Sequence, residues 1–300
     1  MNWIIIAIIS HFLTAIVYIL DKIIVSKTVI RPVFYSFYIG ILGGLTIFLF
    51  PFGFSLMPLS QIIISLIAGT LFVFATYFFY RTIKMSEVSR IIPIIGGSVA
   101  IFTLILTYIF LDERLTSNQF VAFAMLVFGG MIILWPNKNK GSVKRLSLKK
   151  ISFALLAGLL FASSYVLTKF IFSDQSFING FIWIRLGGVL GACLFLISSK
   201  NREAIFSVSK KIKTKIIILP IFSKLLSSFS FILLNYAIFL GNVSIVNALQ
   251  GIQYVFLLII ASFLSVKFPK IIKEQISSVS IFKRITGILF VCFGLIFLTL

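Results

Sequence analysis

The chain has 300 residues, of which 60% are hydrophobic and only 11% are charged, and its formal net charge is +20. A soluble domain carries about 25% charged residues, so this composition excludes a water-soluble globular protein. The hydrophobic runs are about 20 residues long, which suits helices that cross a bilayer and is too long for the strands of a membrane barrel. We therefore predict an all-α integral membrane protein.

Ten hydrophobic runs follow one another along the chain. We predict transmembrane helices over residues 3–25, 34–52, 61–82, 91–111, 118–135, 151–172, 180–198, 216–240, 243–265 and 283–300. The turn Gly241-Asn242 gives the boundary between the eighth and ninth, where hydropathy alone shows none. The segment 136–150, PNKNKGSVKRLSLKK, carries six basic residues and no acid. We predict that it links a first five-helix unit, 1–135, to a second, 151–300.

Basic residues gather in alternate loops. The loops after odd-numbered helices hold every strongly basic segment: Lys27 with Arg31, Lys84 with Arg90, the linker, Lys200–Lys215 and Lys267–Arg284. Because Lys and Arg stay on the cytoplasmic side during insertion, we predict a cytoplasmic linker and both termini outside the cell membrane. The charge lies in short loops rather than on one solvated domain, which argues against nucleic acid as a partner.

The two halves of the chain repeat each other. A shift of 147 residues aligns polar and small residues of the first two helices with those of the sixth and seventh: Tyr18 with Tyr165, Lys22 with Lys169, Gly40 with Gly187 and Gly44 with Gly191. Each half has an odd number of helices, so the halves must lie inverted in the bilayer. Inverted repeats are typical of secondary transporters, which bind substrate near the midplane where the halves meet.

Three stretches carry a resemblance to a known family. Residues 86–134 contain a Pro-bearing helix, the turn DERLT and a Gly-bearing last helix; residues 181–196 read FIWIRLGGVLGACLFL; residues 241–264 read GNVSIVNALQGIQYVFLLIIASFL. In these stretches the chain resembles the ten-helix, EamA-type branch of the drug/metabolite transporter superfamily. It departs from the pattern at Tyr38, which stands opposite Arg185, and at Ala248, which stands opposite Pro93. The charge bias also reverses the orientation expected from the resemblance, in which the acidic turn is cytoplasmic.

Several polar residues fall within the predicted helices, where each has two open interpretations. Arg185, about five residues into the seventh helix, either binds a carboxylate, phosphate or carbonyl group of a substrate or holds carbonyls of a neighbouring helix. Amide side chains recur on the eighth and ninth helices, and they either bind a polar solute or join helices. These are Asn235, Asn247, Gln250 and Gln253.

The first and sixth helices contribute a second group of candidates. Tyr18 and Tyr165 either line a cavity wall or pack between helices, and the equivalent Lys22 and Lys169 either reach the cavity or extend to the interface. Asp21 is the only acid predicted inside the membrane, so it is the single candidate for proton coupling, with a plain salt bridge as the alternative.

The fourth helix contains a candidate hinge at Pro93, Gly96 and Gly97. No metal-ligand cluster, nucleophile–base pair or carboxylate pair is recognisable in the sequence, so we expect neither an enzyme nor a bound cofactor. With seven acids and the single His11, the chain offers little for either.

We predict a secondary transporter that moves a small polar or amphipathic metabolite by alternating access, with export as the expected direction. Its partners would be that substrate, membrane lipid and, as an open option, a coupling ion. Two other classes remain open at this point. One is a membrane enzyme or lipid-handling protein acting on a lipid-linked intermediate, for which Asp112-Glu113 is the candidate; the other is a scaffold whose buried polar residues pair off.

Overall fold

The computed structural model describes residues 2–25, 31–85, 88–134, 147–209, 218–267 and 278–299, and the regular elements in these ranges are helices. In chain order they are α1 (Asn2–Val25), α2 (Pro32–Leu42), the 3-10 helix η1 (Gly43–Phe52), α3 (Leu59–Met85), α4 (Val88–Phe110), α5 (Ser117–Leu134), α6 (Leu148–Asp174), α7 (Phe177–Phe195), α8 (Ser199–Ser209), α9 (Ile218–Leu240), α10 (Val243–Ala248), α11 (Gln250–Lys267) and α12 (Ser278–Thr299).

The ten predicted transmembrane helices coincide with ten helical segments once η1 is joined to α2 and α10 to α11. Among the described residues, eight such segments are long and apolar enough to cross a bilayer. The apolar part of α4, residues 94–110, is shorter, and α12 carries Lys283 and Arg284 near its start. The predicted turn at Gly241-Asn242 separates α9 from α10. The all-α membrane fold is therefore confirmed.

Three local features were not predicted. The second span tightens into a 3-10 helix at Gly43, and the ninth is interrupted at Leu249, between α10 and α11. The basic loop after α7 begins with the helix α8, whose Ala204 and Ile205 are buried against the rest of the protein. The predicted linker, residues 136–150, lies mostly outside the described residues, so its placement stays a prediction.

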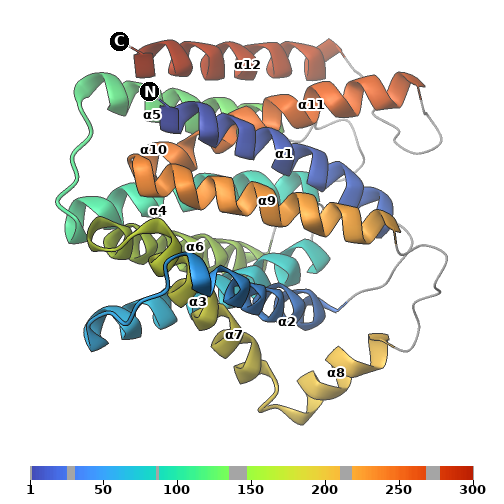
Figure 1. Ribbon diagram of the computed structural model, residues 1–300. Coiled ribbons are helices and arrows are strands. Elements are labelled where there is room, and N and C mark those ends of the chain that lie inside the picture. The colour runs from blue at the N-terminus through green and yellow to red at the C-terminus, as the bar shows by residue number, and fades with distance from the viewer. Residues whose placement is uncertain are drawn as a thin grey trace.

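The helices form a stack in which most run roughly parallel (Figure 1). At one side of the stack α5 packs along α12; at the other, α2, α3 and α7 lie together, with α1 along α9 and α3 along α6 between them. Both ends of the described chain lie at the same end of the stack, which also carries the α4–α5 connection (Figure 1). A chain that crosses the bilayer an even number of times, as the ten predicted helices do, has both ends on the same side.

Helices α3 and α7 approach closely because glycines line their crossing. A Cβ atom on Gly69 would collide with the carbonyl oxygen of Ile184, and one on Gly187 would collide with the backbone of Leu66. This close approach allows the hydroxyl of Thr70 to donate a hydrogen bond to the carbonyl of Gly187 at 3.0 Å. Small residues at such crossings let helices pack tightly inside a bilayer, where the hydrophobic effect does not press them together.

We predict that Gly69→Ala lowers the stability of the protein by about 1–3 kcal/mol, because the added methyl group forces α3 away from α7. Thermal unfolding in detergent measures this loss. Gly188→Ala is the matched control, since a Cβ atom there would lie 3.7 Å from Val73 and 3.9 Å from the carbonyl oxygen of Gly69, which are ordinary contact distances. Equal unfolding temperatures for the two variants would contradict the close crossing.

Candidate functional site

The break between α10 and α11 brings polar side chains together in the protein interior. At this break the carbonyl of Val246 accepts a hydrogen bond from Nε2 of His11 in α1, at 3.1 Å. His11 is 5% exposed. Nδ1 on the other side of its ring lies 3.2 Å from Oε1 of Gln253 in α11. A single histidine therefore joins α1 to both parts of the ninth span.

The hydrogen-bond partners of His11 fix the position of one ring proton. Since a carbonyl can only accept, Nε2 must carry a proton toward Val246. The Nδ1 atom of a neutral ring then needs a donor, which Gln253 supplies if its amide is turned so that Nε2 faces the ring. That orientation also provides a partner for Gln253 Nε2, a buried atom that otherwise has none. A charged ring would instead donate to Oε1, so the pair accommodates either state.

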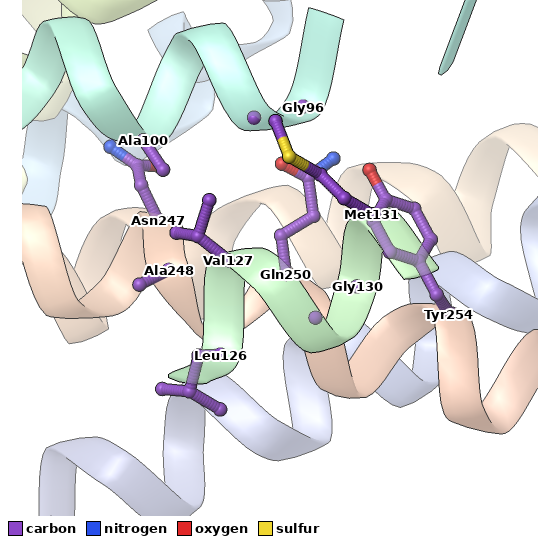
Figure 2. A pocket seen from close by; sticks show the side chains of 12 residues that line it. Gly96, Ala100, Leu126, Val127, Gly130, Met131, Asn247, Ala248, Gln250 and Tyr254 are labelled. Carbon is purple, nitrogen blue, oxygen red and sulfur yellow. The ribbon is translucent and has the colours of Figure 1, made fainter. Parts of the chain in front are cut away.

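Asn247 and Gln250 flank the same break on the side that faces α4 and α5. Asn247 donates to the hydroxyl of Thr103 at 3.2 Å. The side chain of Gln250 extends toward Gly96, beside Tyr254 (Figure 2). These residues border a cavity of about 10 Å³, which has room for about one water molecule.

The candidate hinge glycines border this cavity too. A Cβ atom on Gly96 would collide with the hydroxyl of Tyr254, and one on Gly97 would collide with Met131. The glycines thus make room for larger side chains across the cavity. The side chain of Pro93 lies outside the described residues, and α4 runs through this position as a helix. A hinge at this point stays a prediction.

Arg185 lies near the middle of α7, where the two halves of the chain meet. Its guanidinium carbon is 4.9 Å from the ring centre of Phe231 in α9 and 6.0 Å from that of Phe72 in α3. One nitrogen donates to the carbonyl of Ile39 at 3.3 Å. The described ion pairs do not include this arginine. The guanidinium is thus held by aromatic rings and one carbonyl, with donors left over.

An aromatic cluster continues from Arg185 into the interior. Phe72 contacts Tyr165 of α6, whose ring is stacked on Phe161 at 6.2 Å. Tyr18 of α1 is close enough to Tyr165 and to Gln253 to interact with both. The predicted candidates Arg185, Tyr18 and Tyr165 therefore lie in one interior cluster, next to Gln253 of the ninth span.

The remaining candidates make local contacts. Asn235 donates to the carbonyl of Phe231 within its own helix at 2.8 Å. Lys169 donates to the carbonyls at the end of α9, with its shortest bond, 2.8 Å, to Gly241. Lys22 belongs to α1, but its side chain lies outside the described residues.

Asp21 forms an ion pair with Lys224 of α9 at 3.2 Å and accepts a hydrogen bond from Ser223 at 2.8 Å. The salt bridge considered from the sequence is therefore present. A coupling role for Asp21 stays a prediction.

Comparisons with known proteins agree with this structure. Residues 1–135 match the EamA-like transporter family, which confirms the resemblance drawn from the sequence and indicates a membrane transporter. No curated protein matches the chain. Among solved structures 24 chains match; one of them, described only as the crystal structure of a protein, superposes with a TM-score of 0.63 at 11% identity, covering 98% of this chain and 94% of the other. At that identity the likeness shows the fold alone.

We predict that Lys169→Met lowers the stability by about 1–3 kcal/mol, because the carbonyls at the end of α9 lose a charged donor. Thermal unfolding in detergent measures the change, and Lys149→Met, an exposed lysine on the same helix, is the control. If the variant unfolds like wild type but no longer transports, Lys169 belongs to the transport site instead.

A second prediction concerns Glu113 in the α4–α5 connection, which accepts a hydrogen bond from Asn242 at 2.9 Å. Burial raises the pKa of Glu113 above its usual 4.5, and attraction to Lys169 opposes this only in part. The folded state therefore binds this proton more tightly than the unfolded state, so this group favours folding below the usual pKa, and that contribution is lost as pH rises through the folded pKa.

Glu113→Gln removes this titration and keeps an acceptor for Asn242. We expect the unfolding temperature of the variant, relative to that of wild type, to increase as pH rises from about 4 to about 8. Asp112→Asn, at the neighbouring exposed acid, should not show this gain. Parallel pH profiles for wild type and Glu113→Gln would refute the buried titration.

Proposed function

We propose that this EamA-like transporter is a secondary transporter of the cell membrane that moves a small polar or amphipathic metabolite with an anionic group, by alternating access and in the export direction. The observation that carries the proposal is Arg185, a cation without a described acidic partner, placed among aromatic rings where the two halves of the chain meet.

The surroundings of Arg185 suit such a substrate. A guanidinium forms paired hydrogen bonds to carboxylates and phosphates, and the rings of Phe72 and Phe231 offer contact to an apolar part of the same molecule. The amide of Gln253 and the hydroxyl of Tyr18 lie deeper in the interior and can bind further polar groups. A scaffold would instead pair its buried charge, which Arg185 does not do among the described residues.

The packing of the helices supports the proposed inverted repeats. If the first five spans correspond to the last five, exchanging the halves converts the α3–α6 contact into the α9–α1 contact, and both are extensive. The α5–α12 and α2–α7 contacts convert into themselves, as those of a pseudo-twofold axis would. These contacts support the proposal that residues 1–135 and 151–300 are two copies of one unit.

Some contacts depart from this symmetry, and the α3–α7 contact is the most extensive of them. α3 packs closely on α7, whereas the corresponding pair, α9 and α2, is not packed along its length in the described ranges. There, Lys224 lies over the ring of Tyr35 at 5.8 Å. A transporter with inverted repeats reaches its opposite state when the halves exchange such arrangements. We propose that loosening α3–α7 while tightening α2–α9 moves access from one side to the other.

The alternative enzyme would need the acids of the α4–α5 connection. Asp112 is exposed and pairs with Arg114 at 3.5 Å, and Glu113 accepts a hydrogen bond from Asn242 next to the start of α10. These contacts hold the connection in place, with Asp112 at a positive φ of 48°. They do not favour the enzyme or lipid-handling function over transport.

We predict that Arg185→Gln lowers the flux of anionic metabolites by at least about tenfold, since a charge-assisted hydrogen bond contributes about 1.5–3 kcal/mol. The measurement is uptake by proteoliposomes from a panel of carboxylates and phosphate esters, with matched neutral compounds. The loss should be confined to the anionic members of the panel.

Arg114→Gln is the matched control, because Arg114 is 71% exposed in its side chain and lies in a connection away from Arg185. It should transport like wild type, and both variants should elute and unfold as folded protein. Wild-type flux of every anionic compound by Arg185→Gln would exclude the proposed role.

A further inference from the structure

A second cavity lies outside the interior cluster, at the end of the stack where α2 begins and α3 ends. Its volume is about 410 Å³, and its lining includes Arg31, Tyr77, Arg81, Lys84 and, from α8, Asn201. Three of its lining residues are thus cationic. Of the described residues, no acid lines it, and the acid of α8, Glu203, is exposed.

The position of Arg81 in this pocket is fixed. It donates to the hydroxyl of Tyr77 at 3.3 Å, and its guanidinium carbon lies 4.6 Å from the ring centre of Phe153 in α6. The guanidinium is therefore ordered before any ligand binds, while several of its donors stay available. Such preorganisation reduces the entropy lost on binding.

The start of α2 adds to the positive potential. Pro32 and Val33 line the pocket, and no side chain caps this helix terminus. The first amide groups of a helix and its dipole favour an anion. This contribution adds to that of the three cationic side chains, which already make the electrostatic potential of the pocket positive.

The pocket lies at the level expected for lipid headgroups. Arg81 and Lys84 belong to the last turns of α3, so they lie where a membrane helix leaves the hydrocarbon. α8 beside the pocket has buried Ala204 and Ile205 but exposes Phe206, 55% accessible, together with Lys200 and Arg202. A short helix with exposed apolar and basic groups suits the membrane interface.

We propose that this pocket binds a phosphate group, supplied by the headgroup of an anionic phospholipid or by a soluble phosphate ester. Arg81 and Lys84 contact the phosphate oxygens, and Arg31 closes the outer side. The volume exceeds that of a bare phosphate and admits its glycerol substituent. Basic pockets between membrane helices at the cytoplasmic face bind anionic headgroups in this way. The site is separate from Arg185 and does not depend on the transport proposal.

Native mass spectrometry of the purified full-length chain tests the site by counting bound lipid during titration with phosphatidylglycerol or phosphatidylcholine. We expect phosphatidylglycerol to bind more tightly. The double variant Arg81→Gln/Lys84→Gln should bind it about 30-fold more weakly, because each basic residue near an anionic lipid contributes about fivefold. The control, Arg114→Gln, removes an exposed positive charge from the α4–α5 connection, at the opposite end of the stack, and should keep wild-type affinity.

Addition of glycerol 3-phosphate distinguishes the two sources of phosphate. If it displaces the lipid at millimolar concentration, the pocket recognises soluble phosphate esters; if it does not, the lipid itself is the ligand. Should the double variant not purify as folded protein, Lys84→Gln alone, at an exposed side chain, provides the same comparison with about a fivefold loss. Equal binding of the two lipids, or equal losses in the pocket and control variants, would overturn the proposal.

Discussion

An arginine held inside the membrane without an acidic partner among the described residues constrains the rest of this structure. Moving an arginine to the centre of a transmembrane helix costs about 2.5–3.5 kcal/mol on insertion scales. Contacts of Arg185 with the rings of Phe231 and Phe72 and with the carbonyl of Ile39 offset part of this free-energy cost. Gly43 lies directly against the guanidinium, where a Cβ atom would be 3.0 Å from one of its nitrogens. The glycine pair that begins η1 therefore belongs to the same arrangement.

The interruption of the ninth span has a similar origin. A helix that breaks inside a bilayer exposes backbone groups that water cannot reach, and these need partners from neighbouring helices. His11 supplies one for the carbonyl of Val246, while Gln253 supports the ring from the other side. The small cavity beside Gln250 lies at the same break. Broken helices of this kind provide the substrate and ion sites of many secondary transporters.

Hydropathy and charge predicted the ten spans, because a helix that crosses lipid must be long, apolar and internally hydrogen-bonded. The interior contacts depend on which helices pack together, and a single sequence does not show this. Lys169 is equivalent to Lys22 in the proposed repeat, but the structure places it against the end of α9. His11 gave no signal as a lone histidine in an apolar run. The helix α8 was not predicted, because its basic residues are typical of a loop between membrane helices.

Reactivity of a cysteine placed beside Arg185 tests the account most directly. Phe231→Cys, in a chain whose Cys193 and Cys292 are replaced by serine, puts a thiol where the ring now lies against the guanidinium. We predict that a membrane-impermeant, negatively charged thiol reagent modifies this cysteine in sealed vesicles from at least one side, and that Arg185→Gln slows the reaction. No modification from either side, in a folded protein, would show that the halves enclose no water-accessible site and would contradict the transporter.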